Sequence, residues 1–258
     1  MTRIAAIAVH TFKESVREKV LYNLVAFALL MIGAGIVLGS VSVGINEIAL
    51  INLGLSAISV FGLLIAIFIG ISLVWKEIER RTVYNVLSKP VARHEFILGK
   101  YLGLVLTLAV NAAIMTAGFY AALFYEQRRF GPADAAPLEA VYFILLQLAL
   151  LVGVALLFST LSTPVLSAVF TVGIFVIGNL LGDLRGFGDQ AGNAALRALL
   201  HGLAWALPDF GAFNAISQAA HGELISRQVL WSNSLYALFY ISALVSAAIL
   251  VFERREFS

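Results

Sequence analysis

Side chains that could carry catalytic or metal chemistry are scattered through this sequence. None of the four histidines has another histidine three or four residues away, the spacing with which one helix presents two zinc ligands. Cysteine is absent, which excludes disulfides and thiolate metal sites. The histidines are His10, His94, His201 and His221. We therefore predict that the chain has no catalytic residue, no metal site and no bound cofactor.

One pair of residues, Gly99 and Lys100, resembles the end of a phosphate-binding loop. That motif requires Ser or Thr after the lysine and a glycine five positions before the second glycine. The sequence has Tyr101 and His94 at those positions. Binding of ATP by this device is therefore excluded, and any energy from ATP would have to come from another chain.

The most distinctive segment is 76–100, KEIERRTVYNVLSKPVARHEFILGK, which lies between two long apolar runs. It holds six of the 17 Lys and Arg residues. Glu77 can pair with Arg81 at i,i+4, and the apolar residues around them share one helical face. Pro90 ends this helix, because the residue before a proline is pushed out of the α region. A second helix is expected from about Val91. The pattern predicts a rigid docking element in water.

Within this segment, we predict that Glu77 to Arg93 binds a partner protein. A protein groove binds such an element through a few buried anchors, for which Tyr and Leu are suited, with charged residues at the rim. The basic residues alone would also be explained by membrane topology. The predicted docking residues are Glu77, Arg80, Arg81, Thr82, Tyr84, Leu87, Lys89, Pro90 and Arg93.

The composition around this segment is that of an all-α integral membrane protein. Hydrophobic residues make up 61% of the chain, charged residues 12%, and the mean hydropathy is +0.95. A soluble protein of 258 residues could not bury so much apolar surface. A span needs roughly 20 residues to cross the bilayer. Six spans are predicted, with a turn at 159–164: 21–44, 48–75, 97–125, 139–160, 165–182 and 235–252.

Two further helical segments are predicted at the edges of the membrane. Residues 2–20 place Ile4, Phe12 and Val16 on one stripe, which predicts an amphipathic helix in the headgroup plane. A solvated helical leader is the alternative. Residues 193–220 are helical by pattern but too short for a comfortable span, so they are placed at the outer leaflet. Residues 1–19 lack a long apolar core, so no cleaved signal peptide is expected.

The basic residues predict the orientation. If both termini are cytoplasmic, 12 of the 17 Lys and Arg residues, including every lysine, lie on the inner side. The net charge of +2 is too small to indicate a nucleic-acid partner. The sequence therefore predicts a multi-pass protein with both termini inside.

Polar residues within the spans are few. They should face protein rather than lipid, either as interhelical hydrogen bonds or as the lining of a pathway. Lys100 lies near the inner surface and is expected to extend its amine there. No carboxylate or arginine is predicted near the midplane, which argues against an ion-driven carrier. The uncharged polar residues are Asn52, Asn111, Gln147 and Asn179.

Small residues at four-residue spacing allow close approach of helices. This pattern occurs at Gly99 and Gly103, and at two further pairs predicted to pack helices within one subunit or between two subunits. Those pairs are Gly35 with Gly39 and Gly178 with Gly182.

These motifs resemble an ABC-2 type transporter permease. The resemblance rests on FKESVREKVLYNL, KEIERRTVYNVLSKPVARHEFILGKYLG, PDFGAFN and FERREF, and runs from about Thr11 to Phe257. More narrowly, the sequence is similar to permeases associated with multicopper-enzyme maturation, such as nitrous-oxide-reductase assembly. Copper itself is not indicated, because Met1, Met31 and Met115 are the only soft ligands.

The resemblance implies a transmembrane subunit of the prokaryotic inner membrane, working with separate cytoplasmic ABC ATPase subunits that bind ATP and Mg²⁺. It implies an interfacial elbow helix at 2–20, a coupling helix within 77–93, and outer helices at 193–220. It also implies pairing with a second copy or a paralogous permease, with spans one, two and five near the two-fold axis. The expected function is export. The alternative is a membrane scaffold or mechanotransmitter acting on a periplasmic partner without moving a substrate through itself.

Overall fold

The computed structural model describes residues 3–41, 46–79, 92–127, 131–190 and 194–254. All regular structure in these ranges is helical, as the composition predicts. The helices are α1 (Arg3–Val16), α2 (Lys19–Val41), α3 (Asn46–Glu79), α5 (Arg93–Gln127), η1 (Pro132–Ala135), α6 (Ala136–Leu161), α7 (Pro164–Asn179), α8 (Leu181–Gln190), α9 (Ala194–Ala206), η2 (Gly211–Phe213), α10 (Ile216–Ala220) and α11 (Arg227–Arg254).

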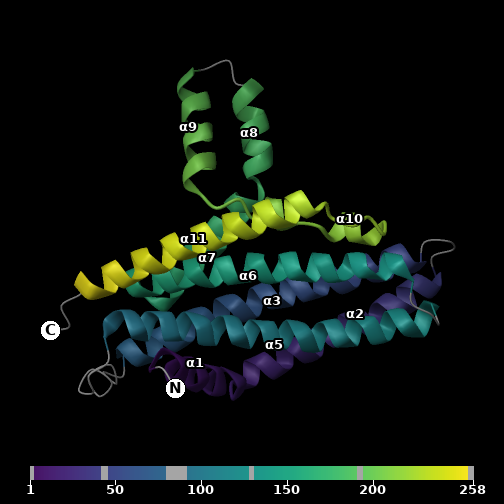
Figure 1. Cartoon of the computed structure of the whole chain (residues 1–258), viewed down its shortest axis with the longest axis horizontal. Coiled ribbons are helices and arrows are strands. Elements are labelled where there is room, and N and C mark those ends of the chain that lie inside the picture. Colours follow the sequence, from purple (N-terminus) through teal and green to yellow (C-terminus); the bar gives the residue numbers. More distant parts are fainter. Residues whose placement is uncertain (1–2, 42–45, 80–91, 128–130, 191–193, 255–258) are drawn as a thin grey trace.

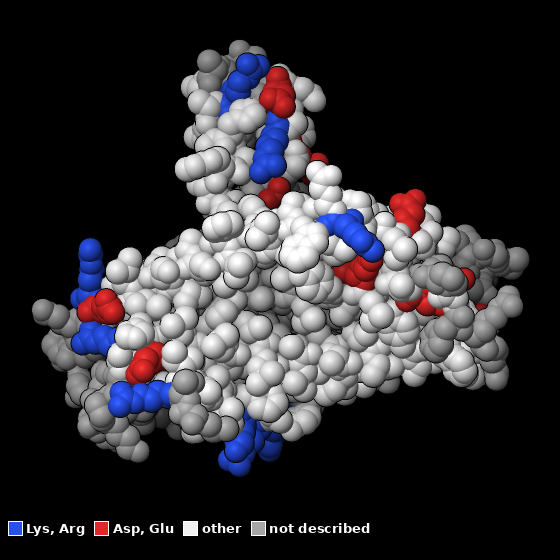
Figure 2. All heavy atoms as spheres, in the orientation of Figure 1, with Lys and Arg blue, Asp and Glu red and all other residues white. Residues whose placement is uncertain are grey.

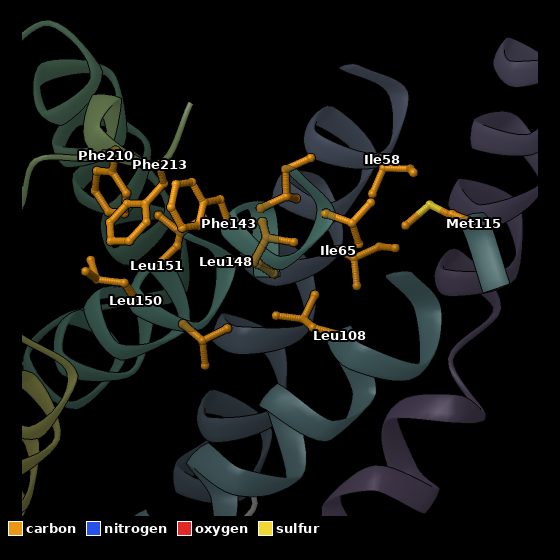
Figure 3. Close-up of a cluster of buried hydrophobic side chains, with 14 of the residues drawn as sticks. Ile58, Ile65, Leu108, Met115, Phe143, Leu148, Leu150, Leu151, Phe210 and Phe213 are labelled. Atoms are coloured by element: carbon orange, nitrogen blue, oxygen red, sulfur yellow. The ribbon is translucent and has the colours of Figure 1, made fainter. Parts of the chain in front are cut away.

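Helices α2, α3, α5, α6 and α11 run along the long axis of one bundle (Figure 1). We call the end that carries Arg3 and Arg254 the terminal end, because both chain termini lie there, and the other the far end. The buried core contains side chains from α3, α5 and α6 together with Phe210 and Phe213 of the segment before α10 (Figure 3). Helix α6 is the most enclosed of the long helices, with 67% of its most apolar window buried, whereas the value for α11 is 22%.

Four described helices are long and apolar enough to cross a membrane: α3, α5, α6 and α11. Two bent pairs raise the number to six if each counts as one span. They are Arg3–Val16 with Leu21–Val37, bent by 66°, and Pro164–Asn179 with Leu181–Phe187, bent by 57°. The structure therefore supports a multi-pass membrane protein with four to six spans.

The break between α6 and α7 falls inside the turn predicted at 159–164. Helix α6 ends at Leu161, and Ser162 adopts an extended conformation. Pro164 starts α7 at a position where its missing N–H costs nothing. The hydroxyl of Ser167 donates to the carbonyl of Phe158 at 2.9 Å, which ties the two helices together across the turn.

The predicted fifth span, 165–182, is not one continuous helix in the structure. Helix α7 ends at Asn179, because Leu180 leaves the helical conformation, and the chain turns by 57° into α8. Helices α8 and α9 form a hairpin that projects away from the bundle (Figure 1). The predicted outer segment 193–220 consequently divides into α9, η2 and α10. The apolar run in the sequence correctly predicted a hydrophobic segment here, but it did not predict the 57° bend after Asn179.

Charged side chains are unevenly distributed over the face in Figure 2. They gather toward the two ends of the bundle, near the junction of α1 and α2, and on the α8–α9 hairpin. The surface between them is mostly uncharged. A broad apolar band between charged ends is what a bilayer-spanning protein requires.

Candidate functional site

The predicted docking segment rejoins the bundle at the start of α5. Ala92 donates its backbone N–H to Glu95 Oε2 at 3.1 Å, the reach-back contact that closes the first turn of a helix. Glu77 lies in the last turns of α3, and Arg93 is the first residue of α5. The other predicted docking residues lie outside the described ranges: Arg80, Arg81, Thr82, Tyr84, Leu87, Lys89 and Pro90.

Arg93 connects the start of α5 with the end of α11. Its guanidinium Nη1 donates to the carbonyl oxygens of Phe252 at 3.3 Å and Glu253 at 2.7 Å. The last carbonyls of a helix lack intrahelical partners and carry partial negative charge, so an arginine stabilises them. The rings of Phe96 and Phe252 stack beside this contact, with centroids 5.8 Å apart. The start of α5, which follows the predicted docking segment in the chain, is therefore attached to α11.

Helix α1 packs along the first turns of α5, and two glycines of α5 make the close approach possible. A Cβ added at Gly99 would lie 2.6 Å from Ile7 Cβ, and one added at Gly103 would lie 2.6 Å from the carbonyl oxygen of Ala8. Real Cβ atoms do not come this close. The four-residue spacing of Gly99 and Gly103 thus packs two helices of the same chain.

Ion pairs join α1 to α5 on either side of this contact. Lys100 Nζ lies 3.6 Å from Glu14 Oε2, and the lysine side chain is 2% exposed. Arg3 and Glu95 are 3.8 Å apart in a more exposed pair. The expectation that Lys100 extends to the surface is wrong, because the amine is enclosed beside Glu14 and lies 5.9 Å from the centre of the Phe96 ring.

This arrangement joins three elements around the re-entry of the docking segment: α1, the start of α5 and the end of α11. Within the described residues, no group of three His, Cys, Asp or Glu side chains could hold a metal ion. Ion pairs, hydrogen bonds and aromatic stacking hold these three elements together. We call the set Glu14, Arg93, Glu95, Phe96, Lys100 and Phe252 the terminal junction.

Sequence reasoning identified Arg93 but missed its partners. Glu14 and Lys100 are far apart in the chain, and Arg93 and Phe252 are farther still, so no local spacing connects them. Glu95 carried one usable signal, since a glutamate at the third position of a new helix commonly caps it.

The four uncharged polar residues of the predicted spans fall into two groups. The side-chain amides of Asn52, Asn111 and Asn179 donate to carbonyls of their own helices, four residues earlier. Gln147 instead reaches another element, donating from Nε2 to the carbonyl of Phe210 at 3.2 Å. Gln147 and Asn179 line one pocket, described below, whereas Asn52 and Asn111 do not.

The remaining predicted packing glycines occupy different surroundings. A Cβ added at Gly35 would lie 3.0 Å from Leu50 Cδ1, so this glycine faces α3. One added at Gly178 would lie 2.5 Å from the Phe210 ring and from the carbonyl of Pro208. Gly182 has open space around it. The surroundings of Gly39 lie outside the described residues. Gly35 and Gly178 therefore make close contacts within this chain.

Comparison with known proteins agrees with this architecture. Residues 5–257 match the family model described as ABC-2 family transporter protein. No curated protein matches the sequence at a significant level. The family match covers nearly all of the chain, including α1, the docking segment, the terminal junction and α11, and the chain accordingly belongs to the ABC-2 family of transporter proteins.

Proposed function

We propose that this chain is the transmembrane permease subunit of an ATP-driven exporter, powered by separate ABC ATPase subunits that hold ATP and Mg²⁺. The ATPase docks on 77–93 at the cytoplasmic side, and the terminal end of the bundle is therefore the inner end. The chain acts beside a second copy or a paralogous permease in a prokaryotic inner membrane. The docking segment also supports a narrower place in the branch associated with multicopper-enzyme maturation.

The observation that carries this proposal is the attachment of the start of α5 to two other helices, to α11 through Arg93 and to α1 through Glu95 and Lys100. A displacement of the docking segment reaches Arg93 and Glu95 directly, since these residues begin α5. Arg93 passes it to α11 through two hydrogen bonds, and Glu95 and Lys100 pass it to α1 through ion pairs. A force applied by an ATPase would therefore move three helices together.

The surface of α7 supports pairing with a second subunit in the membrane. Its buried residues are the small Ser167, Thr171 and Gly178, while large apolar side chains such as Val165 and Val169 point outward. Such a face requires an apolar neighbour, either lipid or another permease. A second permease on this face would place span five near the axis of a dimer, as the resemblance implies.

The docking proposal is tested by purifying the tagged chain from its native membranes and measuring the ATPase that comes with it. Leu87→Asp and Tyr84→Ala should remove most of the co-purified ATPase, because each eliminates a predicted apolar anchor. Arg80→Ala is the matched control, and should retain most of it because a single surface ion pair contributes only ~0.2–1 kcal/mol. Full ATPase binding and stimulation by Leu87→Asp would contradict the proposal.

A second candidate is a mechanotransmitter that uses the same ATPase to act on a periplasmic partner. The placement of the polar residues favours it, since Asn52, Asn111 and Asn179 bond to their own helices. The two functions separate in reconstituted vesicles that contain permease and ATPase. Accumulation of a co-purified solute driven by ATP identifies the exporter, and ATP-dependent change of an outer partner without such transport identifies the transmitter.

A further inference from the structure

A pocket of about 280 Å³ lies between α3, α6 and α7 and is bounded by η2 and α10. Its polar lining consists of Ser59, Gln147, Asn179 and Asn214, and its aromatic lining of Phe175 and Phe213. The remaining lining residues are aliphatic. No charged side chain lines the pocket within the described part of the chain.

The segment 208–214 holds one side of the pocket against the end of α7. The backbone N–H of Phe210 donates to the carbonyl of Gly178 at 3.1 Å, and the carbonyl of Phe210 accepts from Gln147 Nε2. Gly178 is required here because a Cβ would collide with Phe210 and Pro208. The PDFGAFN segment, which contributed to the family resemblance, thus forms part of a wall.

Two aromatic rings line the pocket, those of Phe175 and Phe213, and each packs against a buried ring behind it. The rings of Phe143 and Phe213 meet edge to face at 6.2 Å, and those of Phe175 and Phe210 lie 5.3 Å apart. Figure 3 shows Phe143, Phe210 and Phe213 grouped at one side of the core cluster. Rings fixed in this way are suited to contact with a planar or unsaturated apolar body.

The two amides supply the polar recognition. Gln147 is 5% exposed, and both its Nε2 and Asn179 Nδ2 donate to carbonyls of the protein. Within the described residues, neither side-chain oxygen accepts a hydrogen bond, so each can receive one from a ligand. The complementary ligand group is a neutral donor, a hydroxyl or an N–H. A carboxylate or an ammonium would enter this low-dielectric site without an opposite charge, which is strongly unfavourable.

We propose that the pocket binds an uncharged amphiphile with a planar or unsaturated apolar body and a hydroxyl or N–H head. The volume is just below the usual range for ligand sites, about 300–1,000 Å³, so it takes one small molecule or one end of a longer one. Val176 and Leu180 line it and are 49% and 48% exposed on the outward side of α7. The ligand therefore enters along the outward face of α7.

The inference concerns binding alone and holds whether or not an ATPase drives the chain. The test uses the purified full-length chain in nanodiscs and tritiated 2-naphthol as the probe, with empty nanodiscs subtracted. Saturable binding of 2-naphthol is expected. Its charged counterpart 2-naphthoate should bind at least tenfold more weakly, and equal binding of the two would overturn the proposed chemistry.

Two matched substitutions on α7 locate the site. Val176→Trp should weaken 2-naphthol binding at least tenfold, because the larger side chain fills the pocket from its rim. Val172→Trp places the same side chain one turn earlier, at a position that is 42% exposed and does not line the pocket, and should change binding less than twofold. Both positions are outward-facing, so folding is preserved. Unchanged binding in Val176→Trp, or equal loss in both variants, would overturn the assignment.

Gln147→Leu tests the role of the amide. This change should reduce the preference for 2-naphthol over naphthalene by about tenfold, as expected for a lost hydrogen bond. An unchanged preference would overturn the role given to Gln147. Competition with dioctanoylglycerol then separates the two sources of ligand. Displacement of 2-naphthol supports the site as one for a bilayer lipid, and saturable binding without displacement supports it as one for a small solute.

Discussion

The terminal junction and the pocket use opposite means to hold helices together. The junction relies on charge, with Lys100 beside Glu14 and Arg93 on the end of α11. The pocket relies on neutral contacts, with Gln147 bonded to a backbone carbonyl and Gly178 allowing close packing. The pocket has no charged side chain in its lining within the described residues, so it can accept an uncharged ligand. This difference matches the two roles that we propose, transmission of movement at the junction and ligand binding in the pocket.

The largest effect on stability is expected at the contact between α1 and α5. Gly103→Ala should destabilise the chain by about 2–3 kcal/mol, near the top of the range for overpacking, because the new Cβ meets the backbone oxygen of Ala8, which cannot rotate away. SDS titration in mixed micelles, followed by circular dichroism, measures the change.

The control for this prediction is Gly173→Ala in α7, where nothing lies within 4 Å of an added Cβ. That change should be neutral or slightly stabilising, since alanine is the better helix former. If both variants unfold at the same SDS fraction, α1 is not seated on the glycines as the structure shows.

The buried ion pair is the next test of the junction. Lys100→Met should cost about 1–2 kcal/mol, less than for a fully buried pair, because the Glu14 side chain is 34% exposed overall, although its Oε2, the atom beside Lys100, is buried. A double-mutant cycle with Glu14→Gln measures the coupling between the two residues. A coupling energy near zero in the SDS titration would show that Lys100 contributes only by packing.

The membrane class and the helical content were predictable, because composition and long apolar runs report them directly. Helix boundaries set by proline were also predictable, as at Pro164, which begins α7. The break after Asn179 was not, since the apolar run continues into Leu180 and Leu181 while the backbone turns. The bend coincides with the contacts that Gly178 makes with Pro208 and Phe210, residues remote in sequence.

The sites were only partly predictable for the same reason. Gln147 and Asn179 were recognised as polar residues that should face protein, but their shared pocket depends on Phe213 and Asn214, which come from another segment. Lys100 was placed near the membrane surface, but its enclosure depends on Glu14 and Phe96. The sequence shows which polar side chains require a partner inside the membrane, but the partners come from remote segments and are known only from the fold.

A smaller loss of stability is expected when Gln147 is replaced, and it should exceed the loss at Asn52. Gln147→Leu should cost about 1 kcal/mol in the same titration, because the carbonyl of Phe210 loses its side-chain donor. Asn52→Leu should cost less, since the carbonyl of Ile48 accepts from Asn52 within the same helix, where backbone bonding persists. Equal costs would indicate that Gln147 does not join two elements.

The smallest effect is expected at the exposed rim of the terminal junction. Arg3 and Glu95 are 3.8 Å apart, and the Arg3 side chain is 58% exposed, so water and salt screen the pair. Arg3→Ala should therefore lower stability by no more than about 0.5 kcal/mol, and raising the salt concentration should remove most of this difference. Glu95→Ala should cost more, because it also removes the acceptor for the N–H of Ala92 at the start of α5. Equal effects of the two substitutions would mean that Glu95 contributes only through its ion pair with Arg3. The hydrogen bond from Ala92 to Glu95 would then add no stability to the start of α5.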